Sequence, residues 1–143
     1  MLEWNSPDLW VGNYGDEKPR GLCFSQDVFG GQFTLSDAVY HFEPETGDEK
    51  FIANDIEEWA TALLRDYDIL TGHSIAHDWQ AKNGPIPLRH RLVPLTPFVL
   101  GGKYDLGNLV AMEAAKAMRI RARLAIQLRN LPDGSRISYE IEP

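Results

Sequence analysis

The sequence has little cysteine and no long hydrophobic run. Cys23 is the single cysteine in 143 residues, so no disulfide can form within the chain, and its neighbours Leu22 and Phe24 favour a buried, reduced thiol. No apolar stretch approaches the ~20 residues that cross a bilayer as a helix, and the first residues lack the basic and apolar regions of a secretory signal. We therefore expect a cytoplasmic protein without a membrane partner.

Basic residues are scarce in the first part of the chain. Residues 1–58 hold 13 acids and 3 bases, residues 59–143 hold 8 acids and 11 bases, and the net charge is −7. The acidic first half repels phosphates, which disfavours nucleic acid as a ligand and suits a basic protein partner. Acidic loops that only keep the protein in solution are an equally good interpretation. The arginines near the C-terminus favour nucleic acid only weakly, because an apolar stripe explains their helix as an ordinary amphipathic one.

Motifs for phosphate binding and nucleophilic catalysis are missing. Gly30 and Gly31 belong to neither a GxGxxG nor a Walker pattern, so we interpret them as a tight turn or bulge that needs positive φ angles. Ser25, Ser74 and Cys23 stand in no nucleophile-elbow context. The sequence therefore predicts no catalytic residue and a chain that is not an enzyme.

A histidine pair is the nearest approach to a metal site. His73 and His77 lie four residues apart on one face of a predicted helix, and Asp78 is adjacent. Two histidines at this spacing can bind zinc, but the run HSIAH lacks the glutamate of HExxH, and no third ligand has a spacing that compels it. We predict no metal and no cofactor. A metal-dependent hydrolase that uses these three residues is the alternative.

The overall composition is that of a globular protein. Apolar residues at 43% and charged residues at 24% predict a single domain over residues 1–143. Residues 1–20 have no sustained periodicity, so we expect an irregular segment that Leu9, Trp10 and Tyr14 pin to the body.

One amphipathic helix, over Ile56–Tyr67, has the best-defined pattern. Asn54 or Asp55 begins it as the N-cap, and Glu57 follows Asn54 by three residues, as in a capping box. Its apolar residues recur at three- and four-residue steps, so we expect one face to be buried against the preceding strands. Trp59 is interpreted as a core anchor on this face rather than as a ligand-stacking ring. The face comprises Ile56, Trp59, Ala60, Leu63, Leu64 and Tyr67.

Short apolar runs between turns predict the other elements. Three strands precede the helix, and a meander of antiparallel strands with a packing helix is the simplest topology. A second helix carries Trp79, and a last helix has Ile120, Leu124 and Leu128 on its inner face. The predicted fold class is α+β, with a mainly antiparallel sheet and about three flanking helices. Strands are expected at Leu22–Ser25, Gln32–Leu35, Ala38–Phe42, Phe98–Leu100, Asn108–Met112 and Ile137–Ile141, helices at Thr71–Lys82 and between Glu113 and Leu128, and an extended irregular path through Leu88–Thr96.

Six stretches in order, from about Leu22 to Ile141, resemble the SUKH superfamily, the domain of the fungal Smi/Knr cell-wall regulator and of many bacterial proteins. The resemblance implies an α+β fold and an interaction module without a known catalytic residue. Bacterial members resemble immunity proteins, which bind and neutralise a cognate toxin. The stretches are DVFGGQF (27–33), FEPETGD (42–48), IEEWATALLRDY (56–67), HDWQAKNGPIP (77–87), PFVLGGKYDLGNL (97–109) and IQLRNLPDGSRI (126–137), and the family-like structural anchors are Gly30, Gly31, Trp59, Trp79, Gly101, Gly102 and Asn108.

Family members usually carry further helical sequence ahead of the segment that matches MLEWNSPDLW. This difference predicts a sheet face that a partner or a second copy covers, and hence a possible homo-oligomer. The main hypothesis is a protein-binding module, an immunity protein that neutralises a toxin by direct binding. A regulatory scaffold of the same family is the alternative within the resemblance. The candidate contacts for a basic toxin are acidic, namely Glu43, Glu45, Asp48, Glu49, Glu57 and Glu58.

Overall fold

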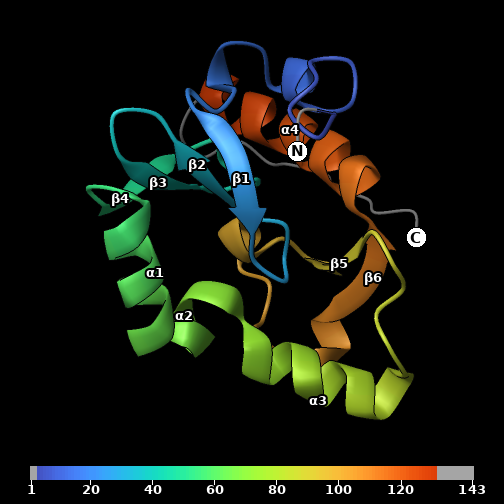
Figure 1. The fold of residues 1–143 in the computed structure, drawn as a ribbon. Helices are drawn as coiled ribbons and strands as arrows, with labels where there is room; N and C mark the ends of the chain where they lie inside the picture. Colours follow the sequence, from blue (N-terminus) through green and yellow to red (C-terminus); the bar gives the residue numbers. More distant parts are fainter. Residues whose placement is uncertain (1–2, 132–143) are drawn as a thin grey trace.

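The structure, a computed structural model, describes residues 3–131 and has an α+β fold (Figure 1). A four-stranded antiparallel sheet has the strand order β1-β2-β3-β4, so each strand pairs with its neighbour in the chain. The predicted meander is therefore confirmed. The predicted strand at Ile137–Ile141 lies outside the described residues. The four strands are β1 (Leu22–Gln26), β2 (Gln32–Leu35), β3 (Val39–Phe42) and β4 (Glu49–Ala53).

A separate two-stranded sheet pairs β5 (His90–Pro94) with β6 (Leu109–Glu113), antiparallel. The predictions for this region are partly wrong. Pro94 is the last residue of β5, a position where the missing N–H breaks no ladder, so the strand forms where we expected an irregular path. The predicted strand at Phe98–Leu100 is instead a 3₁₀ turn, η2, which closes because the N–H groups of Gly101 and Gly102 donate to the carbonyls of Phe98 and Pro97.

Three helices follow one another around one side of the molecule (Figure 1), namely α1 (Ile56–Arg65), α2 (Tyr67–Thr71) and α3 (His73–Asn83). The capping box is shifted by one residue from the prediction. Asp55 accepts from the N–H of Glu58, whose carboxylate accepts from the N–H of Asn54. The predicted helix ends at Arg65, because the backbone of Asp66 leaves the helical region, and the chain turns into α2.

The apolar face of α1 is less buried than we predicted. Trp59 packs edge-on against Phe24 and at a tilt against Phe33, with ring centroids 4.9 and 5.5 Å apart. Ile56 and Leu64, however, are 44% and 83% exposed, and no residue of α1 is fully buried. The short sheet and the turn at Asp66 leave the outer part of this face without a neighbour.

The largest buried side chains come from the N-terminal segment. Trp10 and Tyr14 are both 0% exposed and pack with Phe42 and Met118. Tyr14 lies in the 3₁₀ helix η1 (Val11–Glu17), and its hydroxyl donates to the Pro44 carbonyl at 2.7 Å. The expectation that Trp10 and Tyr14 hold this segment to the body is confirmed.

The helix α4 (Ala114–Asn130) lies across the N-terminal segment (Figure 1) and supplies side chains to two core clusters. Its inner face differs from the prediction, because Leu124 is fully buried but Ile120 and Leu128 are only half-buried. The small side chains of Ala122 and Ala125 are fully buried on this face of α4, which allows η1 to pack closely against the helix. Among the residues described, no helix is long and apolar enough to span a membrane.

The outer edge of β1 is occupied by a side chain. The amide of Asn5 donates to the Cys23 carbonyl at 2.9 Å and accepts from the Cys23 N–H at 2.8 Å. The Cys23 side chain is buried, and burial, with a smaller effect of the Glu49 charge, raises its pKa to about 12. The predicted buried, reduced thiol is therefore confirmed.

Candidate functional site

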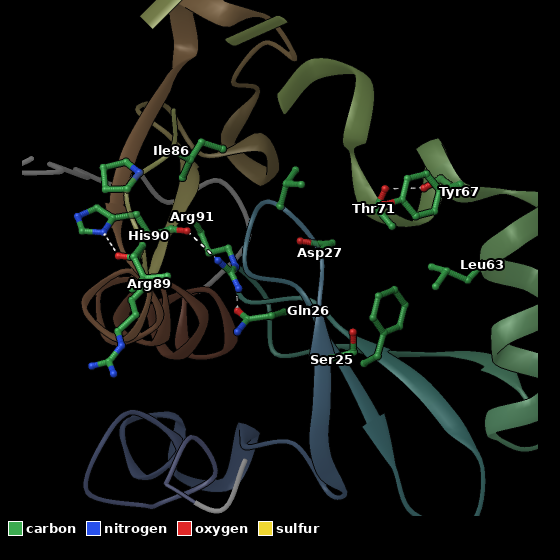
Figure 2. A pocket seen from close by; sticks show the side chains of 14 residues that line it. Ser25, Gln26, Asp27, Leu63, Tyr67, Thr71, Ile86, Arg89, His90 and Arg91 are labelled. Atoms are coloured by element: carbon green, nitrogen blue, oxygen red, sulfur yellow. Dashed lines mark hydrogen bonds between the residues drawn. The ribbon is translucent and has the colours of Figure 1, made fainter. Parts of the chain in front are cut away.

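An open groove of about 510 Å³ separates two walls that are far apart in the sequence. Figure 2 shows Leu63, Tyr67 and Thr71 on the α1–α2 wall, and Ile86 with residues 89–91 on the facing wall. The end of β1 lies between the walls and forms the floor. The backbone joins these parts, because the Val28 N–H donates to the Thr71 carbonyl and the Val28 carbonyl accepts from the Leu92 N–H, both at 2.9 Å.

Large apolar side chains stand exposed on both walls. Leu88 and Tyr67 line the groove and are 88% and 47% exposed. Leu64 of α1 and Ile69 of α2 are 83% and 86% exposed but do not line the groove. Exposed apolar groups that gather around one concavity are typical of a protein-binding surface.

The wall at residues 89–91 is basic. Arg91 donates from Nε to Gln26 Oε1 at 3.2 Å and from Nη1 to the His90 carbonyl at 2.8 Å, and among the described residues it has no ion pair (Figure 2). Burial lowers the pKa of Arg91, and the charge of Asp27 opposes this effect only in part. The guanidinium therefore lies partly out of water with neutral partners.

Arg89 has the only positive φ angle, +60°, among the non-glycine residues that the structure describes. This conformation places its carbonyl where it accepts from the Ala114 N–H at 2.8 Å, beside the last pair of the β5–β6 ladder. A left-handed backbone at a residue with a side chain is strained by about 1 kcal/mol or more and occurs preferentially at functional sites.

The loop from Asp27 to Gly31 begins at a half-buried carboxylate, Asp27, that also lines the groove. Asp27 Oδ1 accepts from the N–H groups of Phe29 and Gly31 at 2.9 and 2.8 Å, and Asp27 Oδ2 lies 2.8 Å from His41 Nε2. A Cβ at Gly31 would overlap both atoms of this Asp27–His41 pair. A Cβ at Gly30, where φ is +85°, would come within 2.6 Å of Arg121 Nη2. The two glycines are therefore required for close packing around polar groups.

The pKa values of His41 and of the neighbouring Glu43 are both raised. Burial tends to lower the pKa of His41, but the hydrogen bond and charge of Asp27, with the charge of Glu43, raise it overall. Burial raises the pKa of Glu43. The hydrogen bond from the Glu45 N–H and the charge of Arg121 lower it, but by less. Among the described residues, no hydroxyl or thiol hydrogen-bonds to His41. The carboxylate–imidazole pair thus lacks the nucleophile that would make it a triad.

Arg121 lies behind the same loop, on α4. It is 2% exposed and donates to the carbonyls of Phe29 and Ala117 at 2.6 and 3.2 Å, without an ion pair in the part of the chain described. With Glu43 and the ring of Tyr104 it lines a second hollow of about 180 Å³. This arginine holds the glycine-pair loop against the helix.

The predicted acidic contacts are split between interior and surface. Glu45 is 3% exposed and its carboxylate accepts from the N–H groups of Phe98 and Val99, so it holds the η2 turn. The Glu49 side chain is only 6% exposed, and that of Asp48 is 65% exposed and paired with Arg129. Glu43 is half-buried, whereas Glu57 and Glu58 are exposed on α1. The structure therefore does not gather the six into one acidic surface.

The three side chains of the alternative metal-site hypothesis stand on the surface of α3. The rings of His73 and His77 have centroids 6.3 Å apart, and both residues and Asp78 are exposed. Within residues 3–131 no group of three or more histidine, cysteine, aspartate or glutamate side chains is placed to hold a metal ion.

The remaining family-like anchors have structural partners. Trp79 is 9% exposed and donates from Nε1 to the Leu109 carbonyl at 3.3 Å. The Asn108 side chain accepts from the Thr96 N–H at 2.8 Å and donates to the Thr96 carbonyl at 3.0 Å, which ties the loop before β6 to the end of β5. A Cβ at Gly102 would overlap the Thr96 carbonyl, and Gly101 has a φ of +90°.

Leu88, Arg89 and Arg91 line the groove but were not predicted as site residues from the sequence. Their segment was interpreted as an irregular path, although a leucine and two arginines within four residues form a basic, apolar cluster in an acidic chain. No protein-family model matches this sequence, and no curated protein matches it either.

Proposed function

We propose that this chain is a protein-binding module of the SUKH immunity type, which neutralises a cognate toxin in the cytoplasm by direct binding and without catalysis of its own. The six family-like stretches support the family. The observation that carries the proposal is the groove, where Leu88 and Tyr67 stand in the open on opposite walls. Covering such side chains removes apolar surface from water, which contributes about 25 cal/mol for each Å² before the entropic cost of association is subtracted.

In this proposal the chain acts by occupying a functional surface of the toxin. A few residues near the centre of an interface supply most of the binding energy, and tyrosine and arginine side chains are enriched among them. The groove combines both kinds. A regulatory scaffold of the same family would use the same surface, and the identity of the partner separates the two roles.

Co-expression with the protein encoded by the neighbouring reading frame tests the proposal. If that protein is a toxin, we expect its expression alone to stop growth, co-expression of this chain to restore growth, and the two proteins to co-purify. Leu88→Glu, which places a charge on an 88% exposed position of the groove, should abolish rescue without unfolding the chain. Lys82→Glu, which places the same charge at an exposed position of α3 outside the groove, is the matched control and should rescue fully. Toxicity that persists with the folded wild-type chain, with no complex formed, would refute the proposal.

A further inference from the structure

We infer that the groove binds an acidic, apolar segment of the partner protein, whose carboxylates pair with Arg89 and Arg91 and whose apolar side chains pack on Leu88 and Tyr67. This inference rests on the proposed function and adds the chemistry of the partner to it. It reverses the sequence-based expectation, in which acidic residues of this chain meet a basic toxin.

The charge of the groove is opposite to that of the whole chain. Arg89 and Arg91 line it, in a protein whose net charge is −7. The carboxylate that lines it, Asp27, is already bonded to His41 and to two backbone N–H groups. A carboxylate on the partner therefore meets positive charge here, and complementary charge sets both the orientation of a complex and its rate of formation.

Arg91 has hydrogen-bond donors that the protein itself leaves unused. Its Nε and Nη1 atoms donate to neutral acceptors, and Nη2 has no partner among residues 3–131. Because a guanidinium binds a carboxylate through two parallel N–H groups, the Nη1–Nη2 edge is suited to an aspartate or glutamate side chain. Such a pair would also compensate for the partial removal of Arg91 from water.

The backbone conformation and exposure of Arg89 also support binding of a carboxylate from the partner. A glycine would adopt its φ of +60° without strain, yet an arginine occupies the position and its side chain is exposed beside the groove. No ion pair of Arg89 forms within the described part of the chain. A strained backbone that carries an unpaired cation at a concavity is explained if the cation binds something outside the chain.

The apolar side chains favour a protein segment over a nucleic acid. Leu88 is 88% exposed and Tyr67 is 47% exposed, and the other apolar groups of the walls, Leu63 and Ile86, are half-buried. A phosphate backbone would gain nothing from Leu88, whereas a leucine or phenylalanine of a partner would be covered by it.

Binding of the purified toxin to variants of the full chain tests this inference. We expect Arg91→Gln and Arg89→Gly each to weaken binding about tenfold or more, and the Kd of the wild type to rise with salt more steeply than that of either variant. Arg89→Gly should raise the Tm at the same time, because it relieves the left-handed strain. Arg65→Gln, which removes an exposed arginine of α1 outside the groove, is the matched control and should bind within about twofold of wild type. Hydrogen exchange in the complex should slow at residues 63–71 and 86–91.

The outcomes separate this inference from the proposed function. If the toxin binds and is neutralised but Arg89→Gly and Arg91→Gln bind as tightly as wild type, the groove assignment is wrong and the proposed function stands. Loss of binding in a Glu57→Lys, Glu58→Lys double variant alone would place the interface on the acidic surface of α1. If the toxin is not bound at all, both ideas fail. Tighter binding of a fluorescent single-stranded oligonucleotide than of the toxin would assign the groove to nucleic acid instead.

Discussion

Gly31 has no room for a side chain, because Asp27 and His41 meet beside its Cα atom. Its φ angle is not left-handed, so the requirement for glycine here is one of space rather than of backbone conformation. Gly30, next to it, has both requirements. The glycine pair that resembles a family motif is therefore explained by the polar groups packed around it.

Gly31→Ala should destabilise the protein by about 1–3 kcal/mol, because the added methyl group separates a hydrogen-bonded, half-buried pair. Gly107→Ala is the control, since a Cβ there meets only Asp105 Oδ1 at 3.5 Å and φ is not left-handed. Denaturant unfolding of both variants measures the difference. Equal stability of the two would show that the Asp27–His41 pair moves aside freely.

His41 should make the stability depend on pH above neutrality. Its pKa in the folded protein is raised from 6.5, so the stabilisation is complete below pH 6.5 and is lost as the pH rises through the folded pKa. Asp27 and Glu43 favour the charged imidazole, and Lys50 opposes it. The Tm of the wild type should therefore fall as the pH rises above about 6.5, and that of His41→Gln should fall less. The raised pKa of Glu43 acts in the same direction, and its contribution to stability begins to be lost as the pH rises above 4.5.

Among the elements, the first three strands of the meander could be predicted closely, whereas β4 and the groove could not. Alternating residues and turn residues act locally, so Gln32–Leu35 was predicted with its observed bounds, and the N-cap of α1 was within one residue. The groove depends on how α1 and α2 lie relative to residues 86–91, which no local pattern encodes. The same holds for burial. Leu64 fits the apolar face of a helix by periodicity, yet it is 83% exposed because no element within residues 3–131 covers it.

Removal of Trp10 should be more damaging than removal of Trp59. Trp10 is 0% exposed and touches the rings of Trp4, Tyr14 and Phe42, so Trp10→Ala should cost about 3–5 kcal/mol. Trp59 is half-buried, and Trp59→Ala should cost about 2–3 kcal/mol. Leu64→Ala, at an exposed position, should change the stability by less than about 0.5 kcal/mol. A larger loss at Trp59 than at Trp10 would mean that the N-terminal segment contributes little to the core.

At the scale of the whole molecule, α4 joins parts that are distant in the sequence. Met118, Ala122 and Ala125 pack with the N-terminal segment, and Ala117 packs with Val93 and Met112 of the two-stranded sheet. The first of these clusters also contains Cys23 and Phe42 of the four-stranded sheet, so both sheets pack against the same helix.

This arrangement predicts a single cooperative unfolding transition. Tryptophan fluorescence, which reports on residues near both sheets, and far-UV circular dichroism should give the same denaturation midpoint. Ala117→Asp, which places a charge at a fully buried position of α4, should lower the midpoint of both signals together. Two separate transitions would show that the two sheets unfold independently.

The contact between Asn5 and Cys23 bears on how copies of this protein meet. An edge strand with open backbone groups is a template on which the same strand of another molecule can add, and such growth leads to aggregates. Here a single amide takes up the Cys23 N–H and carbonyl that a further strand would need. The Asn5 side chain therefore occupies this point of the sheet edge, so we expect that the β1 strands of two molecules cannot pair there.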